Sequence, residues 1–448
     1  MEHTLKGNGS VKFDKEFELT GDFFIEGVLG EIWNKRQNLL YLNVKDNSVN
    51  QHLNNFPFSP WNFEGTSHEG IVIKANGMAL TKQSYSTNEQ GQLTNKFGFN
   101  ILEIIVGDAS SFDYIEFLIP NFLIGFDILV KQGDKQIRNM TSFTLEYNEI
   151  SYSLELIGVN NPVAQKNEII SNNKDLVTVQ LKVKRANGRI DYEEAKEVVE
   201  LVLELCTVAY GGRVSWGTCL GILDEKKSFR IFRDVPFAPL KPSRQLMPVN
   251  FYHVLSGLII NCFPLYSKLN NEQRLNFMKL IGGIHLSTLH LVFPAPFVTL
   301  GSIIEEFSNL ELEEKITHFV GKADRRALLP KFKAFIEEDV MGLLDESDKI
   351  YFEESELKQK LSGLLGRTLR SRIISLLDSF EIEYEEDLVG QFVKKRNAAA
   401  HGTYEYTAGD YQIFSTMAAL LERIALMKIQ YKGQFLDWST SPPEHKNM

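Results

Sequence analysis

Between residues 13 and 185, apolar and polar side chains alternate in short runs, and this period-two pattern predicts β-strands. The runs at 141–147 and 150–156 show it most clearly, and Asn148-Glu149 between them suits a tight hairpin. Similar runs occur at 101–106, 115–119 and 177–183. Short strands at this density, separated by Gly and Asn turns, predict an all-β sandwich or barrel-like domain over residues 1–186.

The middle of the chain, residues 187–299, mixes helical and strand-like patterns. Asp191 is a suitable N-cap for a Val- and Leu-rich helix over residues 192–210, which Gly211 then ends. A strand-like stretch follows at 228–232. We therefore expect a helical and mixed connector between the two ends of the chain.

The next part of the chain has the periodicity of α-helices and lacks proline between Pro330 and Pro442. Residues 302–305, Ser-Ile-Ile-Glu, have the form of a capping box that opens a helix. We therefore place the start of a helical domain near Leu300 and expect a helical bundle over residues 300–432.

The end of the chain combines an apolar helix with a polar tail. A helix over 410–430 presents a stripe of Ile, Met and Leu that suits the core or a dimer contact. Residues 433–448 are polar and are expected to form a flexible tail. The predicted fold is α+β and multidomain, with an all-β N-terminal domain followed by a mostly helical region.

Composition and charge restrict the classes of function. The 448 residues carry a net charge of −10, which argues against coating nucleic acid by bulk attraction, so an RNA site must be a local positive pocket. The chain starts without a secretory signal pattern and lacks a long apolar run, so we expect a cytoplasmic protein that does not enter membranes. Cys206, Cys219 and Cys262 are widely spaced in apolar surroundings, which favours buried reduced thiols.

The most informative segment is residues 388–402. Its apolar residues lie at helical spacing and define one buried face: Leu388, Val389, Phe392 and Val393. Arg396 follows at the edge of that face, and Asn397 and His401 lie four residues apart on one side, separated by three alanines. Gly402 suits the left-handed residue that ends a helix, which places His401 on the final turn.

These residue types suit RNA cleavage without a metal or another cofactor. His401 would move protons around the 2′-hydroxyl and the leaving oxygen, and Arg396 would hold the charge of the phosphorane. Asn397 would orient either side chain by hydrogen bonds. On an ideal helix Arg396 and His401 point about 140° apart, so two copies facing each other in a symmetric dimer would complete the pocket.

The pattern of Arg396, Asn397 and His401, followed by Gly402 near the end of a helical domain, resembles the HEPN superfamily, in particular its ApeA-like branch. The resemblance covers about the last third of the chain, and the β-rich first part suits that branch. It implies a homodimeric ribonuclease toxin that cleaves cellular RNA such as tRNA in antiviral defence by abortive infection. We expect the β domain to sense or position a partner, and a phage-derived trigger or regulator is the candidate for it. Lys394, Lys395 and Tyr404 beside the motif, and Arg370 upstream, are candidate RNA contacts.

Other interpretations stay open at this point. Arg396 could form an ion pair with Glu385 or Glu386, and His401 could simply cap its helix. The protein would then be a non-catalytic interaction module, in which the helical domain only dimerises and the β domain binds a partner. His285 and His290 are five residues apart, so they lack the spacing of two metal ligands on one helical face. No metal site is expected.

Overall fold

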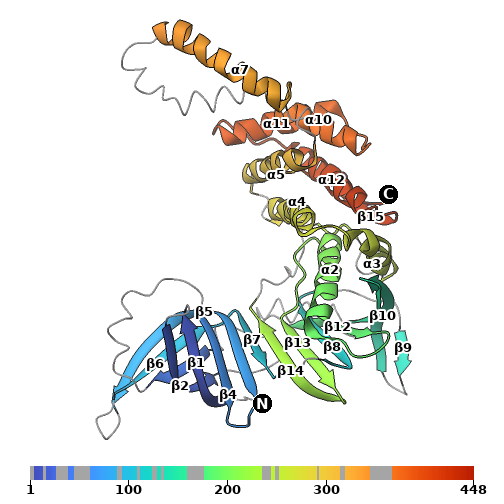
Figure 1. Cartoon of the computed structure of the whole chain (residues 1–448). Helices are drawn as coiled ribbons and strands as arrows, with labels where there is room; N and C mark the ends of the chain where they lie inside the picture. The colour runs from blue at the N-terminus through green and yellow to red at the C-terminus, as the bar shows by residue number, and fades with distance from the viewer. Residues whose placement is uncertain are drawn as a thin grey trace. The chain divides into compact units, whose positions relative to one another are not determined.

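A computed structural model of the chain describes residues 5–13, 17–26, 39–44, 61–87, 93–107, 111–123, 129–132, 136–158, 176–234, 244–247, 252–289, 292–312, 318–343 and 366–448. The chain divides into two compact units, Met1–Ser267 and Lys268–Met448, which we call the β unit and the helical unit. The predicted connector, 187–299, is therefore shared between them. The α+β multidomain architecture agrees with the prediction (Figure 1).

The first half of the β unit is a closed barrel. Its strands are β1 (Leu5–Phe13), β2 (Phe17–Glu26), β3 (Leu39–Val44), β4 (Trp61–Ser67), β5 (Val72–Thr87) and β6 (Leu93–Asn100). They are joined in the order β4-β1-β2-β3-β6-β5, and antiparallel pairing of β4 with β5 closes the ring. Alternating residues such as Trp61 and Phe63 fill the core, so these two aromatic side chains are structural.

The sheet continues from β5 beyond the barrel in the order β7-β14-β13-β8-β12-β11-β10-β9. These strands are β7 (Glu103–Val106), β8 (Tyr114–Pro120), β9 (Leu129–Gln132), β10 (Gln136–Tyr147), β11 (Ile150–Gly158), β12 (Val177–Arg185), β13 (Thr218–Leu223) and β14 (Lys226–Arg233). The predicted hairpin is confirmed, because Asn148 and Glu149 join β10 to β11 with φ of 49° and 65°. The strand-like stretch at 228–232 lies in β14.

Helix α2 (Tyr192–Tyr210) packs on this second part of the sheet (Figure 1). Its N-cap is Asp191, and Gly211 ends it with φ of 75°, so both predicted ends are confirmed. The hydroxyl of Tyr152 on β11 donates to Glu194 at 2.5 Å, and Phe122 meets Tyr210 edge-on. Helix α3 (Tyr252–Tyr266) packs on α2 and β10.

The helical unit contains the predicted bundle. Its main helices are α4 (Asn271–Leu289), α5 (Ala295–Glu311), α7 (Lys322–Phe335), α10 (Leu369–Ser379), α11 (Glu386–Ala400) and α12 (Asp410–Lys428). Helix α5 packs against α4, α10 and α11, and α12 packs against α4, α5 and α11. The apolar stripe predicted for the last helix is buried, including Met417, Leu421 and Ile424.

The prediction that a capping box at residues 302–305 opens a helix is wrong. Helix α5 begins at Ala295, so the expected capping box at 302–305 lies inside the helix and Leu300 is one of its buried residues. The helix extends upstream of these residues, where α4 packs against it. Ile303 lies close to Gly283 of α4: a Cβ atom on Gly283 would be 2.1 Å from Ile303 Cδ1. Ser302 therefore has no helix end to cap.

The end of the chain differs from the expected flexible tail. Strands β15 (Gln434–Asp437) and β16 (Glu444–Asn447) form an antiparallel hairpin. The buried carboxylate of Asp437 forms ion pairs with Arg423 of α12 at 2.6 Å and with Lys446 of β16 at 2.5 Å. Burial alone would raise the Asp437 pKa, but hydrogen bonds from Lys446 and Ser439 lower it to about 2. The hairpin is thus fastened to α12 by charge.

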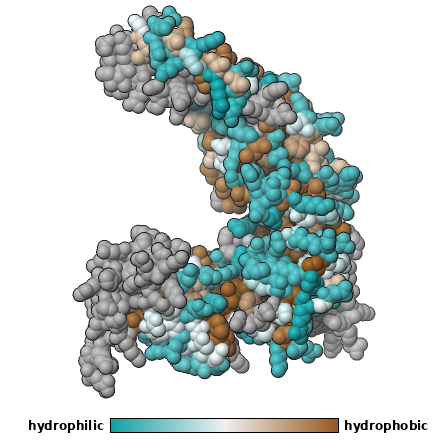
Figure 2. Space-filling view, viewed as in Figure 1, coloured by the Kyte–Doolittle hydropathy of each residue, from teal (hydrophilic) through white to brown (hydrophobic). Residues whose placement is uncertain are grey.

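The surface is mixed in polarity. In the view of Figure 2, hydrophilic side chains cover much of the visible face, and hydrophobic side chains emerge in small groups between them. None of the described helices has the length and apolar content needed to cross a bilayer.

Candidate functional site

The motif lies at the C-terminal end of α11, and the buried face of this helix sets its direction. Val389 and Phe392 are buried as predicted, and Leu388 and Val393 are half-buried. The Phe392 ring lies 5.7 Å from that of Phe297 on α5. Arg396 follows Phe392 by one helical turn, so it lies at the edge of the buried face of α11. From there its side chain extends along α5.

Arg396 forms an ion pair with Glu305 of α5. Its Nη2 lies 3.0 Å from Oε1 and 3.1 Å from Oε2, and its side chain is 21% exposed. Gly301, one turn before Glu305, makes room for this arrangement, since a Cβ there would be 2.7 Å from Arg396 Cγ. The guanidinium is therefore held against the backbone of α5.

The alternative partners considered for Arg396 are not the ones it uses. Glu385 and Glu386 lie at the opposite end of α11, ten or more residues and about 15 Å away along the helix axis. Glu386 instead accepts from Arg370 of α10 at 2.7 Å. Arg370 is thus placed beside the start of α11, away from the motif.

Asn397 completes the arrangement around the guanidinium, because its Oδ1 accepts a hydrogen bond from Arg396 Nη1 at 3.2 Å. Asn397 itself is exposed. Arginine has five N–H donors, two of them on Nη1, so one Nη1 donor is left for a further acceptor. Glu305 and Asn397 thus leave one Nη1 donor of Arg396 unused.

His401 is the C-cap residue of α11, and the predicted role of Gly402 is confirmed. Gly402 has φ of 72°, its N–H donates to Ala399 at 3.4 Å, and the N–H of Thr403 donates to Ala398 at 2.9 Å. This pair of bonds is the Schellman motif that satisfies the last carbonyls of a helix. The His401 side chain is exposed, and within the described part of the chain no group hydrogen-bonds its imidazole.

Lys395 and Tyr404, both expected as RNA contacts, converge on Asp410 at the start of α12. Lys395 Nζ lies 2.9 Å from Asp410 Oδ1, and the Tyr404 hydroxyl donates to Oδ2. The Tyr404 ring also packs 6.1 Å from Phe297. These contacts fasten the loop that follows His401 to the bundle, so both side chains have a structural role here.

The Asp410 network strongly perturbs two ionisable groups. Burial alone would raise the Asp410 pKa, but hydrogen bonds from Thr407, Tyr404 and Lys395 outweigh it and lower the pKa to about 2. Burial and the bond to this carboxylate raise the pKa of Tyr404. Asp410 therefore stays ionised and Tyr404 stays a hydrogen-bond donor throughout the neutral range.

The site residues expected from the sequence thus separate into groups. Arg396 and Asn397 touch each other, and His401 follows on the last turn of the same helix. Lys394 is exposed beside them and has no partner in the described ranges. Glu305, Gly301 and Asp410 were not foreseen as part of this region. Glu305 was missed as a site residue because residues 302–305 were interpreted as the start of a helix. Its spacing of four residues from Gly301, on the same helical face, is the signal that could have identified it.

Other candidate groups lie away from the motif. His285 is buried in α4, whereas His290 lies outside the described residues. Among the residues that the structure describes, no three His, Cys, Asp or Glu side chains are arranged to hold a metal ion. The three cysteines are free and buried as predicted: Cys206, Cys219 and Cys262.

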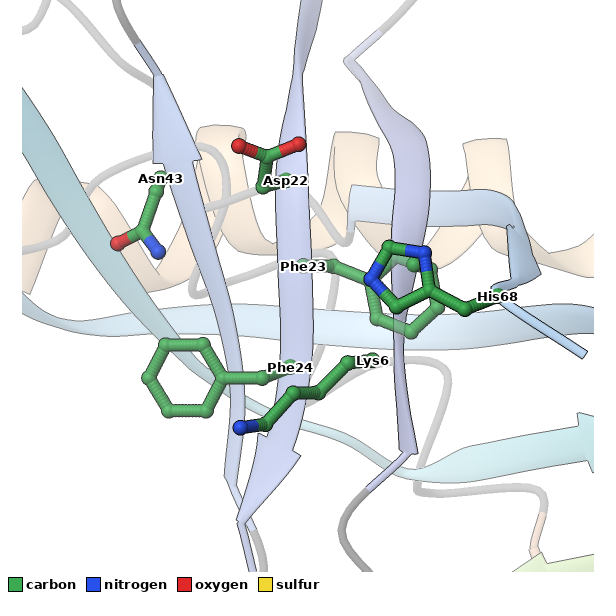
Figure 3. Close-up of a pocket in the computed structure, with 7 residues that line it drawn as sticks. Lys6, Asp22, Phe23, Phe24, Asn43 and His68 are labelled. Atoms are coloured by element: carbon green, nitrogen blue, oxygen red, sulfur yellow. The ribbon is translucent and has the colours of Figure 1, made fainter.

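A pocket of about 440 Å³ lies on the outer face of the barrel (Figure 3). Lys6 and Phe24 are register partners on β1 and β2, and Asp22 and Asn43 are partners on β2 and β3. The Phe24 ring stacks on Tyr41 with centroids 4.7 Å apart. Lys96 Nζ lies 4.5 Å from the centroid of the Phe24 ring and 4.1 Å from that of Tyr41, so a cation of the protein itself packs on this stack.

Comparison with known proteins does not place the chain in a family: no family model matches it, and no curated protein matches it.

Proposed function

We propose that the helical unit is a metal-independent endoribonuclease of the HEPN type, acting as a homodimer. The observation that carries the proposal is the arrangement of Arg396, which Glu305 and Asn397 hold at the exposed end of α11, one turn from the exposed His401. A guanidinium fixed before substrate arrives stabilises developing charge without reorganisation. An exposed histidine at the same helix end can reach a ribose hydroxyl.

The reaction divides between these residues in a defined way. The 2′-oxygen of the RNA attacks the adjacent phosphorus while His401 takes the hydroxyl proton. The bond from phosphorus to the 5′-oxygen breaks, and the protonated imidazole gives that proton to the leaving 5′-oxygen. Arg396 binds a non-bridging oxygen through the free Nη1 donor, and Asn397 keeps that donor in place. The products are a 2′,3′-cyclic phosphate and a 5′-hydroxyl end.

A second copy of the chain supplies the missing half of the pocket. In one copy the Arg396 side chain lies along α5, whereas His401 extends from the end of α11. Two motifs that face each other across a twofold axis bring an arginine of one copy to a histidine of the other. Mixing Arg396→Ala and His401→Ala proteins should then restore part of the cleavage that each lacks alone. A mixture as inactive as its components would contradict a shared pocket.

Cleavage of cellular RNA, such as tRNA, in antiviral defence is the role that we propose for this activity. Expression of the wild-type chain should arrest growth, and the His401→Ala chain should not. In this scheme the β unit senses the trigger, a phage-derived molecule, and the barrel pocket around Phe24 is one candidate surface for it among the described residues. Equal growth with both chains would contradict the toxin role.

The second candidate is a non-catalytic dimerisation module whose β unit binds a partner. The barrel pocket favours it, because an aromatic stack beside Lys6 and Asp22 is a binding surface that needs no catalytic helical unit. Purified protein discriminates the two candidates: this module would leave RNA intact at every concentration, whereas the ribonuclease would cleave it in the presence of EDTA.

A further inference from the structure

Helix α7 is strongly basic in a protein that is acidic as a whole. Five of its fourteen residues are Lys or Arg and one is Asp, while the chain carries a net charge of −10. None of its residues is buried. A cationic surface of this kind, in an otherwise acidic chain, is the local positive site that RNA would require.

The basic residues of α7 are ordered around the helix. At 100° per residue, Lys322, Arg326 and Lys333 fall within about 40° of one line, whereas Lys331 lies on the opposite side. Lys333 is paired with Glu337 at 3.5 Å. Lys322 and Arg326 meet no acidic or hydrogen-bonding partner in the described ranges of the chain, so their charges are available.

An exposed aromatic ring precedes this basic line in the chain. Phe319, three residues before Lys322, has 62% of its surface exposed. The guanidinium of Arg367 lies over its ring, 5.3 Å from the centroid. One face of the ring is therefore backed by a cation, and the opposite face can accept a flat group.

We propose that the segment from Phe319 to Arg326, with Arg367, binds single-stranded RNA. The Phe319 ring stacks on a base, and Lys322 and Arg326 contact the phosphates on either side. Aromatic stacking combined with cations along a backbone is the usual means of holding single strands without sequence preference. The inference rests on the proposed function, for which it supplies the substrate-binding surface.

The charge pattern favours RNA over an anionic membrane. The apolar residues Leu328 and Phe332 are half-buried and not free to enter lipid. The exposed acidic residues Glu337, Glu338 and Asp339 directly continue the helix, so a helix lying in the membrane plane would press them against anionic headgroups. An RNA strand that crosses only the first turns avoids these carboxylates.

Equilibrium binding to a protein that does not cleave provides the test. The full chain with His401→Ala is titrated into a short fluorescein-labelled single-stranded RNA, and anisotropy is measured between about 50 and 200 mM salt. Adding Lys322→Ala with Arg326→Ala should reduce the slope of log K against log salt by about 0.7 for each lost phosphate contact. Adding Phe319→Ala should weaken binding about tenfold.

Two matched controls keep this test specific. Lys331→Ala removes the same charge from the other side of α7, and Phe335→Ala removes another exposed phenylalanine; neither should change the affinity or the slope. Equal effects of the test and control variants would overturn the proposal. It would also be overturned if Lys322 and Arg326 were needed for flotation with phosphatidylserine vesicles and not for RNA binding.

The outcomes separate this inference from the proposed function. If RNA binding depends on Phe319 and Lys322 but the wild-type protein leaves RNA intact, the binding surface is supported and the ribonuclease activity is refuted. A wild type that cleaves RNA, with binding indifferent to Phe319, Lys322 and Arg326, would refute the binding surface alone.

Discussion

Arg396 on α11 and Glu305 on α5 form an ion pair, with Arg396 Nη2 at 3.0 Å from Glu305 Oε1, although they are 91 residues apart in the chain. The pair fixes the guanidinium at the edge of the helical core, and Asn397 takes a second donor. In the proposed ribonuclease this pair performs the positioning of the catalytic cation. Substitutions in α5 and α11 therefore test this role most directly.

Gly301→Ala should disturb this positioning. The added Cβ would lie 2.7 Å from Arg396 Cγ, so the arginine side chain must shift from its place beside Glu305 or α5 and α11 must separate. A displacement of this order lowers the rate by up to about a hundredfold when a catalytic group is involved. The measurement is RNA cleavage under single-turnover conditions.

Gly282→Ala is the matched control for that substitution. Gly282 is also inside a helix, α4, and a Cβ there would meet no atom within 4 Å. The substitution should raise the free energy of unfolding by about 0.5–1 kcal/mol and leave cleavage unchanged. Equal activity of the Gly301→Ala and Gly282→Ala proteins would show that the close approach of α5 to Arg396 is unimportant.

Lys394 and Lys395 are neighbours that should behave differently. Lys395→Ala removes a cation from the buried carboxylate of Asp410 and should lower the free energy of unfolding by about 2 kcal/mol. Lys394→Ala changes an exposed side chain and should stay within about 0.5 kcal/mol. Urea denaturation of both variants measures this, and equal midpoints would contradict the role assigned to Lys395.

The Asp410 network predicts acid sensitivity in a defined range. The pKa of this carboxyl is lowered from 3.8 to about 2 on folding, so it stabilises the protein above about pH 4 and loses this effect as the pH falls toward 2. For this buried carboxyl, the shift corresponds to about 2 kcal/mol. Asp410→Asn should flatten the stability profile over that range in denaturant titrations; an unchanged slope would contradict it.

The three cysteines should be inert while the protein is folded. Burial raises the pKa of Cys206 and of Cys262 to about 12, and it also raises that of Cys219. Since the thiolate is the reactive form, a chromogenic disulfide reagent at pH 8 should label none of them in the native protein and all three after denaturation. Rapid labelling before unfolding would show that one of these sites opens.

Local features were predictable from the sequence because short-range chemistry determines them. Asn148-Glu149 tolerate the left-handed backbone of a hairpin, Asp191 caps α2 through its own side chain, and Gly402 ends α11 without a Cβ penalty. The placement of Arg396 at the edge of the α11 core followed in the same way from the spacing of Val389 and Phe392.

Features that depend on distant contacts were not predictable. The barrel is closed by the pairing of β4 with β5, and β13 and β14 enter the same sheet between β7 and β8. Ser302 has the chemistry of a helix cap, yet α4 packs across that point and the helix continues. Glu305 and Asp410 joined the candidate site only once the helices were packed together.

In the proposed ribonuclease, Arg396 and His401 cleave RNA without a metal. Purified wild-type protein and its Arg396→Ala and His401→Ala variants are incubated with total cellular RNA in EDTA, and the new ends are sequenced and tested for their chemistry. We predict 2′,3′-cyclic phosphate and 5′-hydroxyl ends with the wild type, and a loss of at least about a hundredfold in each variant. Activity that EDTA abolishes, or that both variants retain, would contradict the proposed ribonuclease.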